Sequence, residues 1–335
     1  MRKFTDQKAI LAKLEKETRV AQRDLENDNV RHMMSGVSET KRMMRDLIVS
    51  EYMNDFGSLQ WDLPTAKHRG TLLRIEKGLT EILNSFGRLA VKHLHDSIVK
   101  NRQQEVLRGL WMLDNTVPPK TNVYALNGLE IKESDIPLEG EPEWSLKIHT
   151  WNELLKRQAM SQLQAQALHR TSISDAAKAV DAKIPLPQGN YDYESLLERL
   201  TTNEILNAQA AGRGDVAEAN SDIVEQEVFL TLDDARVCDE CDQEEGKEVD
   251  ESNQPPLHVN CRCYTSIVPK QWADLLRSGD SDDNELANHL EDLGLVPTSM
   301  AIRGPDGELQ GRVVVEFDTF ANKYGPLIGQ YQGIR

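Results

Sequence analysis

Cys238-Asp-Glu-Cys241 and His258-Val-Asn-Cys261-Arg-Cys263, separated by sixteen residues, form the stretch that decides how this chain is built. All four cysteines of the protein lie in this window, together with one of its eight histidines. A gap of two residues lets both sulfurs of a Cys-x-x-Cys pair reach one ion, and zinc takes four sulfur or nitrogen ligands in a tetrahedron. The order of residues therefore predicts a structural zinc knuckle, with five candidate ligands for four positions.

Two alternatives to a zinc knuckle stay open at the level of sequence. The four cysteines can form two disulfides, or they can remain unligated thiols in a core. The first residues, Met1–Arg19, are charged throughout and contain no apolar signal-peptide core. We therefore expect the protein in a reducing cytosol, which favours metal ligation over disulfides.

The composition indicates a helix-rich protein with long exposed faces. At 335 residues the chain is long enough for two or three domains and a sizeable core. Charged residues make up 28% of the sequence and aromatic residues only 5%, which is typical of such helical proteins. No apolar run approaches the length of about 18 residues that spans a bilayer, so we expect no membrane contact.

The net charge of −16 is distributed unevenly along the chain. Residues 1–115 hold 20 Lys and Arg against 16 Asp and Glu, whereas residues 116–335 hold 19 against 39. The stretch 215–251 alone contains 15 acidic residues, with Arg236 and Lys247 as its two basic ones. Because an acidic surface repels phosphate, the cysteine window is a poor candidate for gripping DNA, and any such contact is expected from the N-terminal half.

Residues 1–115 are predicted to form a helical assembly region. A charged helix is expected over 1–34, with a break at Met33–Val37, followed by a second helix over Glu39–Asp55. A long amphipathic helix is predicted from Thr65 to about Trp111. Its apolar seam follows alternating steps of three and four residues: Leu72, Ile75, Leu79, Ile82, Phe86 and Leu89. Narrow seams of this kind suit bundle or coiled-coil packing, and the charged first helix is expected to need a partner chain.

The rest of the chain divides into three predicted regions. Residues 116–149 contain a hairpin, Val123–Ile131, centred on Asn127-Gly128, and an acidic linker that ends at Glu143. Residues 150–270 form a helix-plus-small-sheet domain that carries the zinc knuckle. Residues 271–335 form a C-terminal extension with a short strand, Arg312–Phe317. The predicted fold class is α+β and mainly helical.

Local signals set the elements of the domain over residues 150–270. Thr150 and Ser174 are candidate caps for helices over Trp151–Arg170 and up to Ala182. Asp192 or Asn190 opens a third helix that ends at Ala211, with Gly212 at its C′ position. Strands are predicted on either side of the cysteine window, over Glu227–Leu232 and Cys263–Val268. Zinc would pin the ends of these two strands and close the acidic loop between them.

Further motif residues surround the cysteine window. The chain reads Asp234-Ala-Arg-Val-Cys238-Asp-Glu-Cys241, then Gly246, then Pro255-Pro-Leu-His258-Val-Asn-Cys261-Arg-Cys263. Upstream lies Gly212-Arg213, and before it Thr202-Asn203-Glu204. This arrangement resembles the signature of the phage minor head proteins, the Mu F-like head-morphogenesis family. That family has Arg-Thr-Glu where this chain has Thr202-Asn203-Glu204, so two of those three residues differ. The resemblance covers roughly residues 150–270.

The resemblance implies a structural, non-enzymatic component of a tailed-phage capsid. Proteins of that family are present in few copies, associate with the portal protein inside the head, and assist DNA packaging or ejection. The implied partners are the portal protein and the major capsid or scaffolding protein, within an oligomeric particle. The implied location is the interior of the phage head, after assembly in the host cytoplasm.

Enzymatic and nucleic-acid-binding readings compete with this interpretation. A zinc deaminase needs a His-x-Glu before its cysteine pair, and here His258 follows the pair. An HNH-like nuclease is closer, because His258 and Asn260 lie beside a cysteine pair. That fold also needs a further catalytic histidine beside an aspartate and a downstream metal-binding residue, and we find neither after Cys263. A zinc-dependent nucleic-acid-binding module would have only Arg236 and Arg262 to meet phosphate. We therefore expect a structural protein and no catalytic residues.

Overall fold

A computed structural model describes the following residues of the chain: 4–5, 7–56, 66–117, 142–169, 172–181, 184–186, 189–231, 237–250, 252–258, 261, 263–270, 296–297, 302–303, 309–310 and 317–328. Long helices account for most of them. The strands of this part are short and pair two by two. The fold is therefore α+β and mainly helical, as the sequence predicts.

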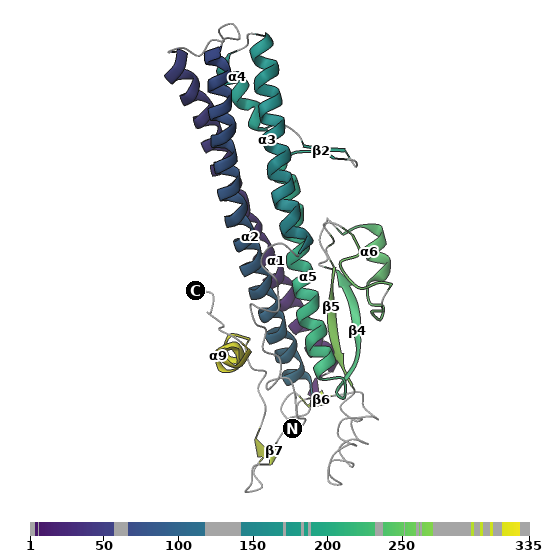
Figure 1. Ribbon diagram of the computed structural model, residues 1–335. Helices are drawn as coiled ribbons and strands as arrows, with labels where there is room; N and C mark the ends of the chain where they lie inside the picture. The colour runs from purple at the N-terminus through teal and green to yellow at the C-terminus, as the bar shows by residue number, and fades with distance from the viewer. Residues whose placement is uncertain are drawn as a thin grey trace. The chain divides into compact units, whose positions relative to one another are not determined.

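The helices and strands follow one another in a simple order (Figure 1). The helices are α1 (Gln7–Phe56), α2 (Ala66–Thr116), α3 (Glu143–His169), α4 (Ile173–Ala177), the 3-10 helix η3 (Lys178–Asp181), α5 (Tyr193–Ala219), α6 (Asp239–Glu244) and α9 (Phe317–Ile328). The strands are β1 (Phe4–Thr5), β2 (Ile184–Leu186), β3 (Gly189–Tyr191), β4 (Val224–Thr231), β5 (Cys263–Pro269), β6 (Val296–Pro297), β7 (Ile302–Arg303) and β8 (Leu309–Gln310). The antiparallel pairs are β1 with β6, β2 with β3, β4 with β5, and β7 with β8.

Contacts divide the chain into two compact units. The hairpin unit comprises residues 1–26, 98–135 and 205–335, and the bundle unit comprises residues 27–97 and 136–204. Each unit is thus assembled from segments that are far apart in the sequence. The linear division at residues 115, 149 and 270 stays a prediction.

The predicted break in the first helix is wrong, because α1 runs unbroken from Gln7 to Phe56. Met33 and Val37 are buried, and burial of such side chains is worth about 1.5–3 kcal/mol each, more than the roughly 1 kcal/mol that a helical glycine costs. Gly36 lies against the ring of Phe86, where an added Cβ would come within 3.3 Å of Cε2. Gly36 therefore serves helix packing and does not end the helix.

The prediction for the second long helix is confirmed, since α2 covers Ala66–Thr116. Ile75, Leu79 and Phe86 of the predicted seam are buried. Asn152 of α3 donates from Nδ2 to the carbonyl oxygen of Leu83, at 3.0 Å, and accepts a hydrogen bond from the hydroxyl of Tyr193. One face of α2 is thus bound to α3 within the bundle unit.

The start of α3 differs from the prediction. The helix begins at Glu143, inside the expected linker, and the amide of Ser145 donates to the carbonyl oxygen of Pro142 at 3.1 Å. Trp144 and Ile148 are buried, so two apolar side chains extend the helix upstream of Thr150. Thr150 is therefore an interior residue of α3 and not its cap.

The predicted caps of the next two helices have mixed outcomes. Ser172, and not Ser174, caps α4, because its Oγ accepts a hydrogen bond from the amide of Asp175 at 3.0 Å. Asp192 caps α5 as predicted, and its Oδ1 accepts from the amide of Ser195 at 2.7 Å. The predicted end of α5 is wrong, because the helix continues through Gly212 to Ala219.

The core of the hairpin unit joins α1, α2, α5, β4, β5 and α9. Trp111 of α2 meets Phe317 of α9 edge to face, with ring centroids 5.5 Å apart. The buried members of this core are Leu14, Val106, Leu107, Leu110, Trp111, Met112, Leu113, Val117, Val216, Ala217, Ile223, Ile267, Phe320 and Ala321. The two-stranded sheet of β4 and β5 is thereby attached to long helices on its apolar side.

Two sequence predictions fall partly or wholly beyond the residues described. The hairpin Val123–Ile131 lies outside them, as do residues 312–316 of the predicted C-terminal strand. Phe317, the last residue of that predicted strand, instead begins α9.

Candidate metal centre

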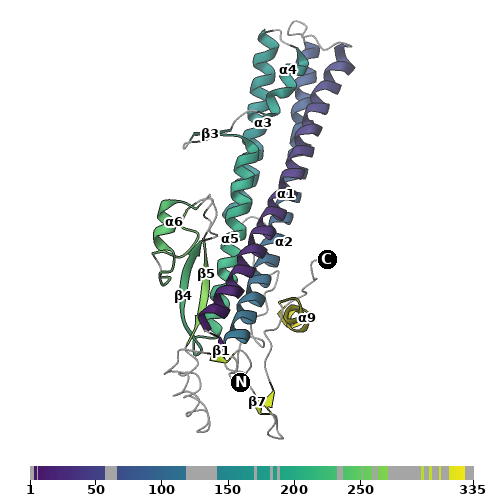
Figure 2. The ribbon, with the colours of Figure 1, turned by 180° about the vertical axis from the view of Figure 1, so that it is seen from behind.

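The strands β4 and β5 provide the frame of the candidate metal centre. They pair antiparallel, with Thr231 opposite Cys263 and Phe229 opposite Thr265. Figure 1 and, from behind, Figure 2 show the two strands side by side along the C-terminal part of α5, with α6 at one end. Both strands were predicted, and Cys263 is the first residue of β5. The centre thus lies where β4 ends and β5 begins.

The first cysteine pair is presented by α6. Cys238 occupies the N-cap position, and Cys241 is a buried residue of the helix. The amide of Asp242 donates to the carbonyl oxygen of Cys238 at 2.9 Å, which closes one helical turn. A single turn brings side chains three residues apart onto one side of a helix, so both sulfurs face the same point.

The acidic loop after α6 is bound back against β4. Gly246 adopts a positive φ of 80°, a conformation that glycine reaches without steric cost. Its amide donates to the carbonyl oxygen of Phe229 at 2.7 Å, and the amide of Val249 donates to that of Glu227 at 2.8 Å. The loop is therefore ordered by backbone hydrogen bonds, although its side chains are mostly acidic and exposed.

The second group of candidate ligands returns from this loop toward the first. Nε2 of His258 lies 3.1 Å from the sulfurs of both Cys238 and Cys241. The sulfurs of Cys241 and Cys261 are 3.6 Å apart. Cys238, Cys241 and His258 form one close group and Cys241, Cys261 and Cys263 another, with ligand atoms within 4.8 Å of one another in each. All five predicted ligands thus meet at one place, and Cys241 belongs to both groups.

The cluster lies in an apolar environment. Phe229, Cys241, Cys261 and Cys263 form a buried core of their own. The partly buried residues packed against that core are Val237, Cys238, Val249 and Leu257. Such surroundings keep water from the sulfurs and strengthen electrostatic interactions among them.

The thiols influence one another strongly. A hydrogen bond from the Cys263 thiol lowers the pKa of Cys261 to about 5, and the same contact, together with burial, raises the pKa of Cys263. Burial raises the pKa of Cys241 to about 12. Hydrogen bonding to the backbone of Cys241 lowers the pKa of Cys238. These thiols compete for protons. A divalent cation would remove this competition, because it favours the thiolate form of each ligand.

The donor set and the distances fit a metal ion. Four sulfurs and one imidazole nitrogen are the ligands that zinc and other borderline metals take in proteins. Ligands at about 2.3 Å from a tetrahedral ion are themselves separated by about 3.8 Å, close to the 3.6 Å between Cys241 and Cys261. All four cysteines are free, and this separation is far beyond a sulfur–sulfur bond of about 2.05 Å. The cluster can therefore hold a metal ion.

Gly212 and Arg213 join this frame to the long helices. A Cβ on Gly212 would lie 2.5 Å from the carbonyl oxygen of Arg102, so a glycine is what allows α5 to approach α2 this closely. Arg213, only 2% exposed, donates from Nε to Glu105 of α2 at 2.8 Å. Its Nη1 donates to the carbonyl oxygen of Thr265 in β5. The Gly-Arg pair thus connects α2 with the strand that begins at Cys263.

The N-terminal end of α1 binds the same strand. Arg19 donates to the hydroxyl of Tyr264, and its guanidinium lies 3.6 Å from the carboxylate of Glu245, just after α6. Ser266 donates to the carboxylate of Glu15. Sequence reasoning missed Arg19 and Glu105, because the partners that join them to this frame are more than a hundred residues away and no local spacing indicates them. The Gly212-Arg213 motif was the feature of the sequence that singled out Arg213.

Other residues singled out in the sequence have different positions. Thr202-Asn203-Glu204 lies well inside α5, which begins at Tyr193. Arg236, Asn260 and Arg262 lie outside the described residues. Within the described part of the chain, none of the helices is both long and apolar enough to cross a membrane.

Comparison of the chain with protein-family models, with curated proteins and with solved structures finds no match. The motif residues and the geometry around them are therefore the basis for assigning a function.

Proposed function

We propose that this chain is a structural minor head protein of a tailed phage, with one zinc ion in its cysteine–histidine centre. The observation that carries the proposal is the meeting in space of separate motif elements. Cys238-x-x-Cys241, His258-x-x-Cys261-x-Cys263 and Gly212-Arg213 are the features that resemble the minor head family. They converge on the end of the strand pair where β4 ends and β5 begins, and on the attachment of β5 to α2.

The zinc ligands in this proposal are Cys238, Cys241, His258 and Cys261. Three short contacts link these four side chains, at 3.1, 3.1 and 3.6 Å. Cys263 then acts as a neighbour whose thiol donates to the sulfur of Cys261, which stabilises a ligating thiolate. Zinc would hold the end of β4, the acidic loop and the start of β5 together.

Four protein ligands make the ion structural. A catalytic zinc site keeps an open position for water, and a tetrahedral site filled by three sulfurs and one nitrogen leaves none. The acidic residues of α6 and of the loop after it, among them Glu240, Asp242, Glu244 and Glu248, would also repel a nucleic-acid backbone. Both features favour assembly over nuclease chemistry or nucleic-acid binding at this centre.

The long helices would make the contacts with other subunits of the head. The portal protein and the major capsid or scaffolding protein are the proposed partners, and the less acidic residues 1–115 are the proposed region for any contact with DNA. In this arrangement the hairpin unit is a rigid, zinc-held element attached to helices that reach the assembly.

Mass spectrometry of purified phage particles tests the proposal. We expect the chain to be recovered with portal and capsid proteins at a few copies per particle. Loss of the chain should leave capsids that assemble while DNA packaging, retention or ejection falls. Absence of the chain from particles that contain the portal protein would contradict the assignment.

A nuclease assay tests the main alternative separately. We expect the zinc-loaded chain to leave DNA intact when Mg²⁺ or Mn²⁺ is added. Reproducible metal-dependent cleavage that disappears in the His258→Ala variant would replace the structural reading with an enzymatic one.

A further inference from the structure

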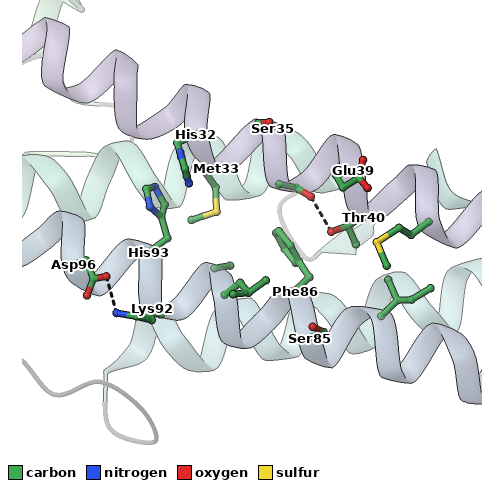
Figure 3. A pocket seen from close by; sticks show the side chains of 15 residues that line it. His32, Met33, Ser35, Glu39, Thr40, Ser85, Phe86, Lys92, His93 and Asp96 are labelled. Atoms are coloured by element: carbon green, nitrogen blue, oxygen red, sulfur yellow. Dashed lines mark hydrogen bonds and ion pairs between the residues drawn. The ribbon is translucent and has the colours of Figure 1, made fainter.

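Helix α1 contributes to both units, and its two parts are attached by different kinds of side chain. Residues up to Glu26 belong to the hairpin unit, and the later residues of the helix belong to the bundle unit. In the later part, Figure 3 shows Met33 and Phe86 in the space between α1 and α2. The large apolar side chains buried there are Met33, Val37, Met44, Ile48 and Tyr52. The later part of α1 is therefore held by apolar packing.

The first part of α1 buries fewer apolar side chains. Among the residues of 11–26 whose burial the structure describes, Leu14 is the one buried hydrophobic residue, and Val20 is 46% exposed. The other buried side chains of this stretch are polar: Thr18, Gln22 and Glu26. A helix that is held by packing needs an apolar stripe against its neighbours. Polar contacts must therefore supply much of the attachment of this part.

Such polar contacts bind the first part of α1 to the strand β5 and to the end of α6. Ser266 donates to the carboxylate of Glu15. Arg19 donates to the hydroxyl of Tyr264, and its guanidinium lies 5.5 Å from the centroid of that ring. The same guanidinium lies 3.6 Å from the carboxylate of Glu245. Arg19 thus contacts two segments that are separated in the sequence by the acidic loop.

Both partners of Arg19 adjoin the cysteine–histidine cluster. Tyr264 directly follows Cys263, the first residue of β5. Glu245 is the C-cap residue of α6, the helix that presents the first cysteine pair. Glu245 also accepts a hydrogen bond from the amide of Thr231, the last residue of β4, at 2.5 Å. Its carboxylate therefore joins α6, β4 and α1 at the place where a metal ion would hold the strands together.

The positions of these partners depend on what holds the cluster. Helix α6 has six residues, and a helix of that length is not stable by itself in water. A two-stranded sheet is likewise marginal without further support. Loss of an ion from the cluster would therefore release Glu245 and Tyr264 from the geometry in which Arg19 contacts both.

We propose that the metal centre is coupled to the first part of α1, with Arg19 as a positioning residue of the centre. This inference rests on the zinc site of the proposed function, but not on a role in a phage head. The ion holds Glu245 and Tyr264 where Arg19 contacts them, and Arg19 in turn holds α6 and β5 where the ligands meet. Because coupling between two sites is reciprocal, zinc orders residues 11–22 and Arg19 strengthens zinc binding.

Competition for zinc with a chromogenic chelator, on the full-length chain, tests the role of Arg19. We expect Arg19→Met to raise the Kd for zinc by at least about fivefold, the lower end of typical couplings between sites. Arg23→Met is the matched control, because Arg23 lies one turn further along the same helix and is exposed. The control should leave the Kd unchanged. An unchanged Kd in Arg19→Met, or an equal rise in both variants, overturns the proposal.

Hydrogen exchange of the unaltered chain, with zinc bound and after its removal by a chelator, tests the opposite direction. We expect protection over residues 11–22 to fall by about tenfold or more on removal, while residues 33–48 keep theirs through apolar packing. Unchanged protection over residues 11–22, or an equal loss in both stretches, overturns the coupling.

The zinc content of the same samples separates this inference from the proposed function. A chain that binds zinc but shows no change in α1 when the zinc is removed contradicts the coupling and leaves the metal centre in place. A chain that binds no zinc at all contradicts the metal centre and the coupling together.

Discussion

Different interactions stabilise the interior of the hairpin unit and the interior of the bundle unit. In the hairpin unit a two-stranded sheet and an acidic loop depend on a cysteine–histidine cluster and on the buried pair Arg213–Glu105. In the bundle unit, long helices pack through apolar seams, and their ion pairs are mostly at the surface, such as Arg42–Glu39 and Lys77–Glu81. A two-stranded sheet is at best marginally stable by itself. The short strands thus rely on specific polar contacts and on the cysteine–histidine cluster, whereas the long helices rely on apolar packing.

Removal of a zinc ligand should have the largest effect, and this effect should be confined to the hairpin unit. Cys241→Ser deletes the residue shared by both groups of the cluster, and structural zinc contributes on the order of 10 kcal/mol to folding in small zinc modules. We expect hydrogen exchange over residues 224–269 to approach that of an unfolded chain, while residues 75–94 stay protected. Cys263→Ser, the control from the same cluster, should still bind zinc. Retained protection in Cys241→Ser would contradict the dependence on metal.

The buried pair should have the next largest effect. Arg213→Met leaves Glu105 fully buried without its main cation, and breaking such a pair costs about 3–5 kcal/mol. Arg102→Met is the matched control, because Arg102 binds Asp215 across the same two helices at 2.8 Å but is partly exposed. We expect that control to cost about 1 kcal/mol or less. Equal losses in chemical denaturation would show that burial of Arg213 is not what attaches the hairpin.

Substitution of Gly212 by alanine should change the stability less than loss of the buried ion pair. It should destabilise the protein, whereas the same substitution at nearby Gly214 should stabilise it. In Gly212→Ala the new Cβ would meet the backbone of Arg102, and overpacking of this kind costs about 1–3 kcal/mol. Gly214→Ala, in the same helix, has no neighbouring atom within 4 Å and should stabilise by about 0.5–1 kcal/mol. Urea denaturation of the two variants measures the difference. A stabilising Gly212→Ala would mean that α5 and α2 lie farther apart.

The bundle unit should show the smallest effect, a sensitivity to acid. Burial lowers the pKa of His93, and the nearby His32 adds to this, while a backbone contact with Asn29 and the charge of Asp96 oppose it. Because the folded state favours neutral His93, its contribution is complete above the unfolded value of 6.5 and is lost as the pH falls through the lower folded pKa. We expect the protection factors over residues 80–96, which correct for the intrinsic exchange rate at each pH, to fall between pH 7 and pH 5, and less so in His93→Gln. An identical pH response in both proteins would exclude His93 as the cause.

The sequence predicted what depends on local spacing. The Cys-x-x-Cys and His-x-x-Cys-x-Cys intervals identified the five clustered residues, and the alternation of apolar residues identified α2, β4 and β5. Asp192 was found as a cap because capping acts over three residues. Each of these signals lies within a short stretch of the sequence.

What the sequence did not predict depends on distant partners. Gly36 and Gly212 looked like helix breaks, yet both are glycines because another helix passes close to them. His95 is a polar residue of α2 and is nevertheless fully buried. Glu105 lies in the middle of a long helix, and its buried ion pair with Arg213 joins it to a residue more than a hundred positions later. The spacing of apolar residues within one helix does not indicate which distant residues will contact it.

X-ray absorption at the zinc edge, on full-length protein purified without chelator, tests the central claim most directly. We predict one zinc ion per chain with three sulfur ligands at about 2.3 Å and one nitrogen ligand at about 2.0 Å. Protein that contains no metal would contradict the account, and so would a sulfur–sulfur distance of about 2.05 Å in place of zinc ligation.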